Sequence, residues 1–225
     1  MTLSWKPTRF DLALAVVLAL GLPFVAGFLY RQTGALLPML LYYGLAWGVA
    51  LWRRGDSGYR NPMPKNPPVW FWVNLGVIAL SLVAARLSPV VTENPHLAGV
   101  LLTALFWAPI NAASEQLLWL YLFDAWDLYP ESTHPAFRGV GLLLFAAFVG
   151  MIHTMFWVHF LTTVQPEPPW GVLFILLTTL SGFLHIVVWR QSKQMIFTFI
   201  PHLLLNLGPL FWTGYTILPY LLTRG

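Results

Sequence analysis

Long apolar stretches separated by short polar segments run along almost the whole chain. A helix that crosses a membrane needs about 17–25 mainly apolar residues, whereas a membrane-spanning strand needs about 9–11. The stretches here have the length of helices, and in lipid only helices and closed barrels satisfy every backbone polar group. The pattern therefore predicts an all-α, polytopic transmembrane helical bundle of about seven spans. They cover residues 12–30, 35–52, 69–86, 97–123, 139–160, 170–189 and 195–222.

The last stretch, 195–222, is long and contains the pair Gly208 and Pro209. Proline removes a backbone donor and interrupts a helix. The stretch is therefore either one kinked helix or a span that ends near Leu207 and is followed by a short second helix. The second arrangement would raise the number of spans to eight.

The composition leaves no room for a domain in water. Of the 225 residues, 58% are hydrophobic and 9% are charged, whereas a soluble domain carries about 25% charged residues. We therefore expect residues 1–225 to form a single membrane domain. The chain has no cysteine, which excludes disulfides, thiolate metal ligands and a cysteine nucleophile.

The basic residues predict the orientation of the chain. Cytoplasmic loops of membrane proteins are enriched in Lys and Arg. With a cytoplasmic N-terminus, nine of the 12 Lys and Arg residues lie inside. These are Lys6, Arg9, Arg53, Arg54, Arg60, Lys65, Arg138, Arg190 and Lys193, whereas Arg31, Arg86 and Arg224 lie outside. Topology thus explains the net charge of +4, and we expect a multi-pass plasma-membrane protein with no nucleic-acid partner.

Polar side chains are distributed unevenly among the expected spans. Such groups are costly in a membrane and are usually functional. The first three spans contain almost none of them, so residues 1–96 are expected to be scaffold helices and residues 97–210 to form the core that holds a site. The last four spans contain Asn111, Ser114, Glu115, Gln116, His153, His159, His185, His202 and Asn206.

One helix face of the fourth span carries a carboxylate. Asn111, Ser114, Glu115 and Leu118 follow the spacing i, i+3, i+4 and i+7, so they share one face. Pro109 precedes this face and is expected to kink the helix. Glu115 is either a functional carboxylate or a neutral, buried side chain that bonds to a neighbouring helix.

The fifth span contains two histidines with different expected positions. His153 lies deep in the span, and Gly150 precedes it by almost one turn. A glycine at this position allows another helix to approach closely. His159 lies six residues further on, so it points to a different face. We expect His159 to be an interfacial histidine without a catalytic role.

The last span carries His202 and Asn206 on one face, four residues apart and just after Pro201. They form either a structural hydrogen-bonded pair or two donors for one substrate oxygen. At about 1.5 Å per residue, Glu115 and His202 lie about 12 Å below the inner membrane surface, whereas His153 lies roughly 20 Å from the start of its span. Helix tilt can close that gap, so these groups are expected to share a pocket open to the cytoplasm.

Two chemistries fit a carboxylate, two histidines and an asparagine. In the first, the carboxylate and one histidine activate water for amide hydrolysis, and the other two groups stabilise the oxyanion. In the second, Glu115, His153 and His202 bind a divalent metal such as zinc, since these are ordinary zinc ligands. The HExxH helix of soluble zinc proteases is absent. The residues alone do not choose between the two.

At these residues the chain resembles the CAAX-protease and bacteriocin-processing (CPBP) family of intramembrane proteases, which is related to the type II CAAX prenyl endopeptidases. That family carries the motifs EExxxR, FxxxH and HxxxN. The third is intact as His202-Leu-Leu-Leu-Asn206, and the second reads Val149-Gly-Met-Ile-His153, with Val in the place of Phe. The first reads Glu115-Gln-Leu-Leu-Trp-Leu120, so Gln116 and Leu120 replace the second Glu and the Arg. The resemblance covers residues 97–210.

The resemblance implies a function and a role for each residue. Glu115 and His153 would activate water, and His202 and Asn206 would form the oxyanion hole. Gln116, in the place of the second Glu, would contact substrate. The implied activity is that of an intramembrane endopeptidase in the lipid bilayer, which cleaves a hydrophobic or lipidated peptide from the cytoplasmic side and requires no cofactor.

Three alternatives remain open from the sequence. The replaced residues of the first motif fit a non-catalytic CPBP relative that acts as a membrane scaffold, chaperone or immunity protein. His153 and His202 could be axial ligands of a haem. Transport would need a continuous polar path across the bilayer, whereas the polar residues here are clustered.

Overall fold

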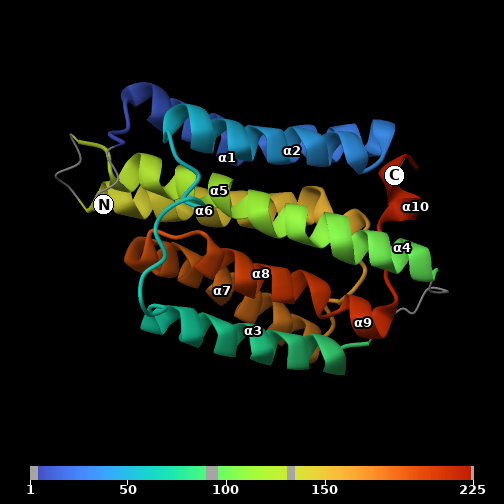
Figure 1. Cartoon of the computed structure of the whole chain (residues 1–225). Coiled ribbons are helices and arrows are strands. Elements are labelled where there is room, and N and C mark those ends of the chain that lie inside the picture. The colour runs from blue at the N-terminus through green and yellow to red at the C-terminus, as the bar shows by residue number, and fades with distance from the viewer. Residues whose placement is uncertain (1–4, 90–95, 131–134, 224–225) are drawn as a thin grey trace. The chain divides into compact units, whose positions relative to one another are not determined.

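The computed structural model describes residues 5–89, 96–130 and 135–223 (Figure 1), so Arg224 lies outside the described residues. Helices form throughout these ranges, without a strand, which confirms the all-α prediction. The helices are α1 (Arg9–Thr33), α2 (Leu36–Gly48), the π-helix η1 (Val49–Arg53), α3 (Val69–Leu87), α4 (Leu97–Leu102), the π-helix η2 (Thr103–Trp107), α5 (Ala108–Asp127), α6 (Ala136–Met155), the 3-10 turn η3 (Trp157–His159), α7 (Trp170–Ser192), α8 (Ile196–Leu207), α9 (Leu210–Thr213) and α10 (Leu218–Leu221).

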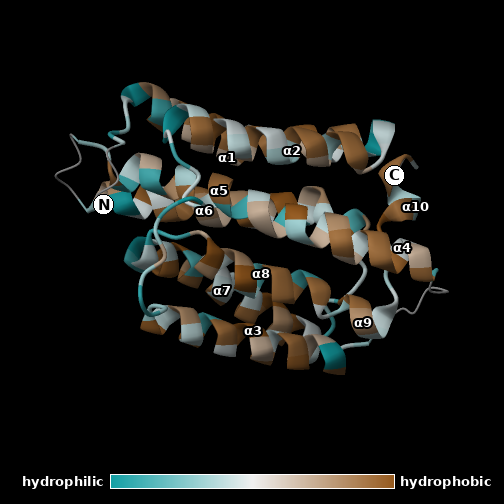
Figure 2. Ribbon diagram, in the orientation of Figure 1, coloured by the Kyte–Doolittle hydropathy of each residue, from teal (hydrophilic) through white to brown (hydrophobic). Residues whose placement is uncertain are grey.

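Six helical segments of the described ranges are long and apolar enough to cross a membrane. Figure 2 shows hydrophobic residues along the lengths of the long helices and hydrophilic residues mainly at their ends and in the connections. The chain is therefore a helical membrane protein. The six segments are Arg9–Thr33, Val69–Leu87, Leu97–Asp127, Ala136–His159, Trp170–Ser192 and Ile196–Thr213.

The expected second span, 35–52, is helical but is not among these six segments. It consists of α2 followed by η1. Its two tyrosines, two tryptophans and three glycines and prolines dilute the aliphatic residues, and Arg53 ends it. That this segment crosses the membrane therefore stays a prediction.

The end of the chain follows the second of the two arrangements expected for 195–222. α8 ends at Leu207, and Gly208 and Pro209 separate it from the short helix α9. Proline has no N–H to continue the ladder of the preceding helix and is well suited to begin a new one. The Gly–Pro pair thus ends α8 and starts α9.

The chain divides into two compact units, and each contains segments that are far apart in sequence. The first unit consists of Met1–Ser57, Ser114–Phe160 and Pro219–Gly225. The second consists of Gly58–Ala113 and Leu161–Leu218. The expected division into scaffold helices 1–96 and a core 97–210 stays a prediction, since it concerns function and not packing.

In the first unit, α1 packs against α2 and α6. At Gly27 the backbone of α1 lies against α6: a Cβ added there would be 2.5 Å from the carbonyl oxygen of Met155. Only glycine lets two helix backbones approach so closely. In the same unit, the Tyr42 ring of α2 packs edge-on against Phe148 of α6, with ring centroids 5.5 Å apart.

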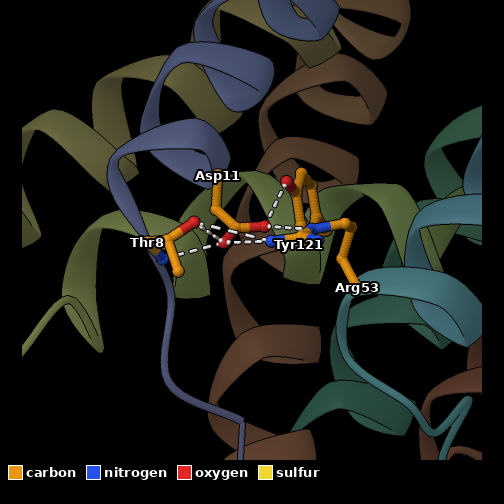
Figure 3. A network of polar contacts seen from close by, with 4 residues as sticks. All are labelled: Thr8, Asp11, Arg53 and Tyr121. Atoms are coloured by element: carbon orange, nitrogen blue, oxygen red, sulfur yellow. Dashed lines mark hydrogen bonds and ion pairs between the residues drawn. The ribbon is translucent and has the colours of Figure 1, made fainter.

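A buried carboxylate joins three parts of the first unit (Figure 3). Asp11, in the first turn of α1, has no exposed surface. Its Oδ2 accepts hydrogen bonds from the backbone N–H and the hydroxyl of Thr8, both at 2.8 Å, which caps the helix. Arg53 of η1 donates to both carboxylate oxygens, and the Tyr121 hydroxyl of α5 donates to Oδ1 at 3.0 Å. The carboxylate therefore fastens α1, η1 and α5 together.

In the second unit, α3 packs against α7 and α8 around a core of Phe71, Val188 and Phe197. The connecting segment before α3 is bonded to the turn between α7 and α8. Asn61 Nδ2 donates to the carbonyl of Lys193 at 2.6 Å. Gly58, with a φ of +81°, lies so close to the Trp189 ring that a Cβ there would collide with it. These contacts hold the connecting segment within the second unit, to which it belongs from Gly58 onward.

Candidate functional site

Glu115 lies in the middle of α5 and is only 2% exposed. Trp157 Nε1, in the turn after α6, donates a hydrogen bond to Glu115 Oε1 at 3.1 Å. The Tyr42 hydroxyl also interacts with this carboxylate, and it accepts a hydrogen bond from Trp119 Nε1 at 3.2 Å. The carboxylate expected from the sequence is therefore buried and held by aromatic side chains that carry a polar group.

The rest of the expected polar face of α5 is also buried. Asn111 and Ser114 are at most 3% exposed, and the Leu118 side chain is fully covered. Trp47 Nε1 of α2 donates to Ser114 Oγ at 3.1 Å. This bond sits one residue before Glu115 and limits rotation of α5 about its axis.

Gln116 and Leu120 occupy the positions where the resemblance expects a Glu and an Arg. They lie one turn apart on α5 and are 0% and 1% exposed. A neutral amide and an aliphatic side chain thus fill a part of the first unit that has no access to water. The expected contact of Gln116 with a substrate stays a prediction.

His153 lies in the last turn of α6 and is exposed. Its Nδ1 lies 2.7 Å from the carbonyl oxygen of Val149, one turn earlier. The expectation of a close helix contact at Gly150 is wrong, because a Cβ added there would meet no atom within 4 Å. His159 follows in η3, where its exposed ring stacks on Tyr30 with centroids 5.5 Å apart. It thus takes part in an aromatic cluster.

His202 and Asn206 lie one turn apart on α8, as expected. His202 is 5% exposed, and it follows Pro201 directly. The Asn206 side chain is partly buried, and its Nδ2 donates to the carbonyl oxygen of Ala108 at 3.2 Å. Ala108 begins α5 directly after the π-helix η2. Asn206 thus holds the point where the helix changes from π to α geometry, a kind of irregularity that is frequent at functional sites.

His185 of α7 is a neighbour of His202 that the sequence did not assign to the site. The two rings lie edge to face, with centroids 5.9 Å apart and planes at 67°. His185 is 3% exposed. The spacing of Ser181 and His185, four residues apart on a helix, was a signal that these polar groups face the same neighbours.

The structure thus describes the expected site residues in two groups. Glu115, Gln116 and His153 belong to the first unit, and His202 and Asn206 belong to the second. The pocket that they were expected to share stays a prediction, as does a haem between His153 and His202.

In the part of the chain that the structure describes, no group of three or more His, Cys, Asp or Glu side chains could hold a metal ion. Zinc ligation by Glu115, His153 and His202 stays a prediction.

Comparisons of the chain with protein-family models, with curated proteins and with solved structures find no match. The likeness to the CPBP family therefore rests on the motif residues described above.

Proposed function

We propose that the chain is an intramembrane endopeptidase that hydrolyses a peptide bond of a hydrophobic or lipidated peptide. The observation that carries the proposal is the Glu115 carboxylate, which is buried in an apolar helix and held at one oxygen by Trp157. A buried carboxylate in a membrane span is expensive, and such groups are usually functional. In this proposal Glu115, assisted by His153, takes a proton from the attacking water and returns it to the amide nitrogen as the C–N bond breaks.

The hydrogen bonds of Glu115 suit this role. A carboxylate has two oxygens with about four lone-pair sites in total, and Trp157 donates to one of these oxygens, Oε1, at 3.1 Å. In the proposed reaction the attacking water binds to the same carboxylate. Trp47, through Ser114, and Trp157 also fix the position of the helix turn that carries it, and a general base must be held within hydrogen-bond reach of the proton that it removes.

His202 and Asn206 supply donors for the negative oxygen that forms when water attacks the amide carbon. An asparagine amide carries two N–H donors, and the bond to Ala108 uses one of them. The burial of His202 favours this role, because a hydrogen bond to an oxyanion is stronger where water is excluded.

The expected topology favours a substrate from the cytoplasmic side of the plasma membrane. We propose that α2 with η1 crosses the bilayer as a seventh span, with the N-terminus in the cytoplasm. Most Lys and Arg residues then lie inside. The hydrophobic or lipidated part of the peptide would dissolve in the bilayer and bring the bond to the protein. The proposed hydrolysis requires no cofactor, and a divalent metal such as zinc is compatible with it.

The experiment uses the full chain reconstituted in liposomes with two internally quenched peptides, one farnesylated and one apolar but unlipidated. We expect cleavage of at least one peptide. In water enriched in ¹⁸O, mass spectrometry should find one ¹⁸O atom in the new carboxylate, since the oxygen comes from water. Glu115→Gln should lower the rate by about 100-fold or more, the usual contribution of a general base.

Glu167→Gln is the matched control, because Glu167 is an exposed carboxylate between α6 and α7. It should cleave at the rate of the wild type. Normal cleavage by Glu115→Gln would show that the proposed mechanism is wrong. No cleavage by the wild type of either peptide would favour the non-catalytic alternative.

That alternative, a membrane scaffold or immunity protein, has one observation in its favour. The buried positions 116 and 120 hold a neutral Gln and a Leu where the resemblance expects a charged pair. A protein that only binds a partner would not need the charged pair.

A further inference from the structure

A chain of buried polar groups crosses the second unit from α3 through α7 to α8. Asn74 of α3 is fully buried, and its Oδ1 accepts a hydrogen bond from Ser181 Oγ at 2.8 Å. His185, one turn further along α7, has Nδ1 at 2.6 Å from the Ser181 carbonyl oxygen. Its Nε2 lies 3.0 Å from the carbonyl oxygen of Thr198 on α8. Ser181 thus joins α3 to α7. A neutral imidazole has one N–H, and with that proton placed on Nε2 the His185 ring donates to Thr198 and joins α7 to α8.

The contact with Thr198 lies where α8 is irregular. Pro201 inside α8 has no N–H and crowds the preceding turn, and helix carbonyls next to a proline turn outward to other donors. In an α-helix the carbonyl of Thr198 is also the acceptor for the amide of His202, four residues later. The Nε2 of His185 therefore bonds to the same carbonyl that the backbone of His202 uses.

His185 also contacts the side chain of His202. The edge-to-face arrangement, with centroids 5.9 Å apart, is a favourable geometry for two aromatic rings. His185 thus touches the ring of His202 and bonds to the turn of α8 that carries it. Rotation of either the helix turn or the ring would break one of these two contacts.

The network also contains a buried polar group that lowers the stability of the fold, which packing alone does not explain. In the described residues, Asn74 Nδ2 is buried without a hydrogen-bond partner. A buried donor without a partner costs about 1–3 kcal/mol, and an apolar residue at position 74 would avoid that cost. The Asn74 side chain does, however, orient the Ser181 hydroxyl beside His185.

We propose that His185 is a positioning residue for His202: it bonds to the Thr198 carbonyl and packs on the His202 ring, which fixes the direction of that ring. The inference rests on the proposed function for the role of His202 in the oxyanion hole. The contacts that carry it lie wholly within the second unit.

Three substitutions separate this role from simple packing. The amide nitrogen of Gln in His185→Gln reaches the position of Nε2 and can still donate to Thr198. The shorter Asn in His185→Asn reaches only the position of Nδ1, and His185→Leu has no donor. In the peptide assay we expect the Leu and Asn variants to lose about 10–100-fold in kcat with KM within about twofold of wild type, because small displacements of a catalytic group have effects of this size. The Gln variant should keep most of the wild-type kcat.

A second measurement does not depend on activity. In detergent micelles, ¹⁵N-histidine NMR reports the ring nitrogens of His202, with the signal assigned by its loss in His202→Gln. We expect this signal to shift or broaden in His185→Leu and to stay near its wild-type position in His185→Gln. Thermal unfolding of each variant checks that it is folded.

The two measurements distinguish the two proposals. An unchanged His202 signal in His185→Leu, or equal kcat values for all three variants, would overturn the positioning role. If the wild type cleaves no peptide, the proposed function fails, and the NMR measurement still decides whether His185 orients His202.

Discussion

Arg53 and Asp11 are joined by two hydrogen bonds, from Nε to Oδ1 at 2.8 Å and from Nη2 to Oδ2 at 3.0 Å. The carboxylate is fully buried, whereas the guanidinium side chain is 21% exposed. Phe10 and Trp52 flank the guanidinium, with ring centroids 5.1 Å and 5.0 Å from its carbon. Planar geometry, two donors and two aromatic neighbours together favour arginine over lysine at this position.

Arg53→Lys should therefore destabilise the protein. Lysine keeps the charge but cannot donate to both oxygens in this geometry, and a lost hydrogen bond to a charged group costs about 1.5–3 kcal/mol. Unfolding in mixed micelles measures the difference. Arg60→Lys, at an exposed position in the connecting segment, is the control and should change stability by less than about 0.5 kcal/mol. Equal effects of the two substitutions would contradict the importance of the Arg53 geometry.

Gly27→Ala should destabilise the contact between α1 and α6. The new methyl group would lie 2.5 Å from the carbonyl oxygen of Met155, and overpacking of this kind costs about 1–3 kcal/mol. Gly21→Ala in the same helix is the matched control, since its Cβ would meet no atom within 4 Å. The same unfolding assay should find Gly21→Ala neutral or stabilising, because alanine favours a helix. A loss of stability at both positions would point to the helix backbone and not to the contact.

Trp157→Phe should lower the catalytic rate, because it removes the donor to Glu115 Oε1. Trp126→Phe is the control in the same unit: Trp126 Nε1 has no hydrogen-bond partner among the described residues, and its ring packs on Phe137. We expect the Trp157 variant to lose about 1.5–3 kcal/mol of stability from the lost bond to a charged group, together with about tenfold or more in kcat. The Trp126 variant should keep its kcat. Peptide cleavage and unfolding are measured for both variants. Equal kcat values would show that the hydrogen bond from Trp157 to Glu115 does not contribute to catalysis.

Gln116→Glu should destabilise the protein strongly, because it places a second charge in a position with no exposed surface. An unpaired buried charge costs about 3–5 kcal/mol. The double variant Gln116→Glu/Leu120→Arg should recover part of that loss through an ion pair between residues four apart on α5. Unfolding measures both variants. If the double variant is less stable than the single variant, the site cannot hold a charged pair.

The proposed seventh span can be tested by labelling, since the chain has no cysteine of its own. Gln32→Cys and Asn66→Cys introduce single thiols at exposed positions on the two sides of the segment formed by α2 and η1. A membrane-impermeant maleimide should label Gln32→Cys in intact cells, and Asn66→Cys only after the cells are opened. Labelling of both in intact cells would mean that this segment does not cross the bilayer.

Hydropathy alone was sufficient for most of the helices. It identified the six long apolar segments, and Gly208 with Pro209 indicated where α8 ends. It could not decide whether the segment 35–52 crosses the membrane, because tyrosine and tryptophan suit both a membrane interface and a protein contact. α5 also continues to Asp127, past the expected end at residue 123.

The continuation of α5 has a physical reason that only the tertiary structure shows. Asp124 is buried, and Arg54 Nη2 lies 3.8 Å from its Oδ2. The adjacent arginines 53 and 54 thus pair with acids on two different helices. The local sequence pattern predicts only that Arg53 and Arg54 are charges at the edge of the membrane. It cannot identify Asp11 and Asp124 as their partners.

Long-range polar contacts also limited the prediction of the site. The residue types and spacings of Glu115, His202 and Asn206 are visible in the sequence, whereas the burial of Glu115 and His202 is seen only in the structure. Asn74 and Ser181, which bond beside His185, are 107 residues apart. No helical periodicity connects residues at such a separation.

The interleaving of the two units bears on how the chain is assembled during translation. Asp11 is synthesised 42 residues before Arg53 and 110 residues before Tyr121. The ribosome adds about 5–20 residues per second, so this carboxylate spends several seconds near the translocon without its full set of donors. Arg53 arrives first and can neutralise it, and the tyrosine joins only when α5 is inserted. The hydrogen-bond network of Asp11 is therefore complete only after more than half of the protein has been made.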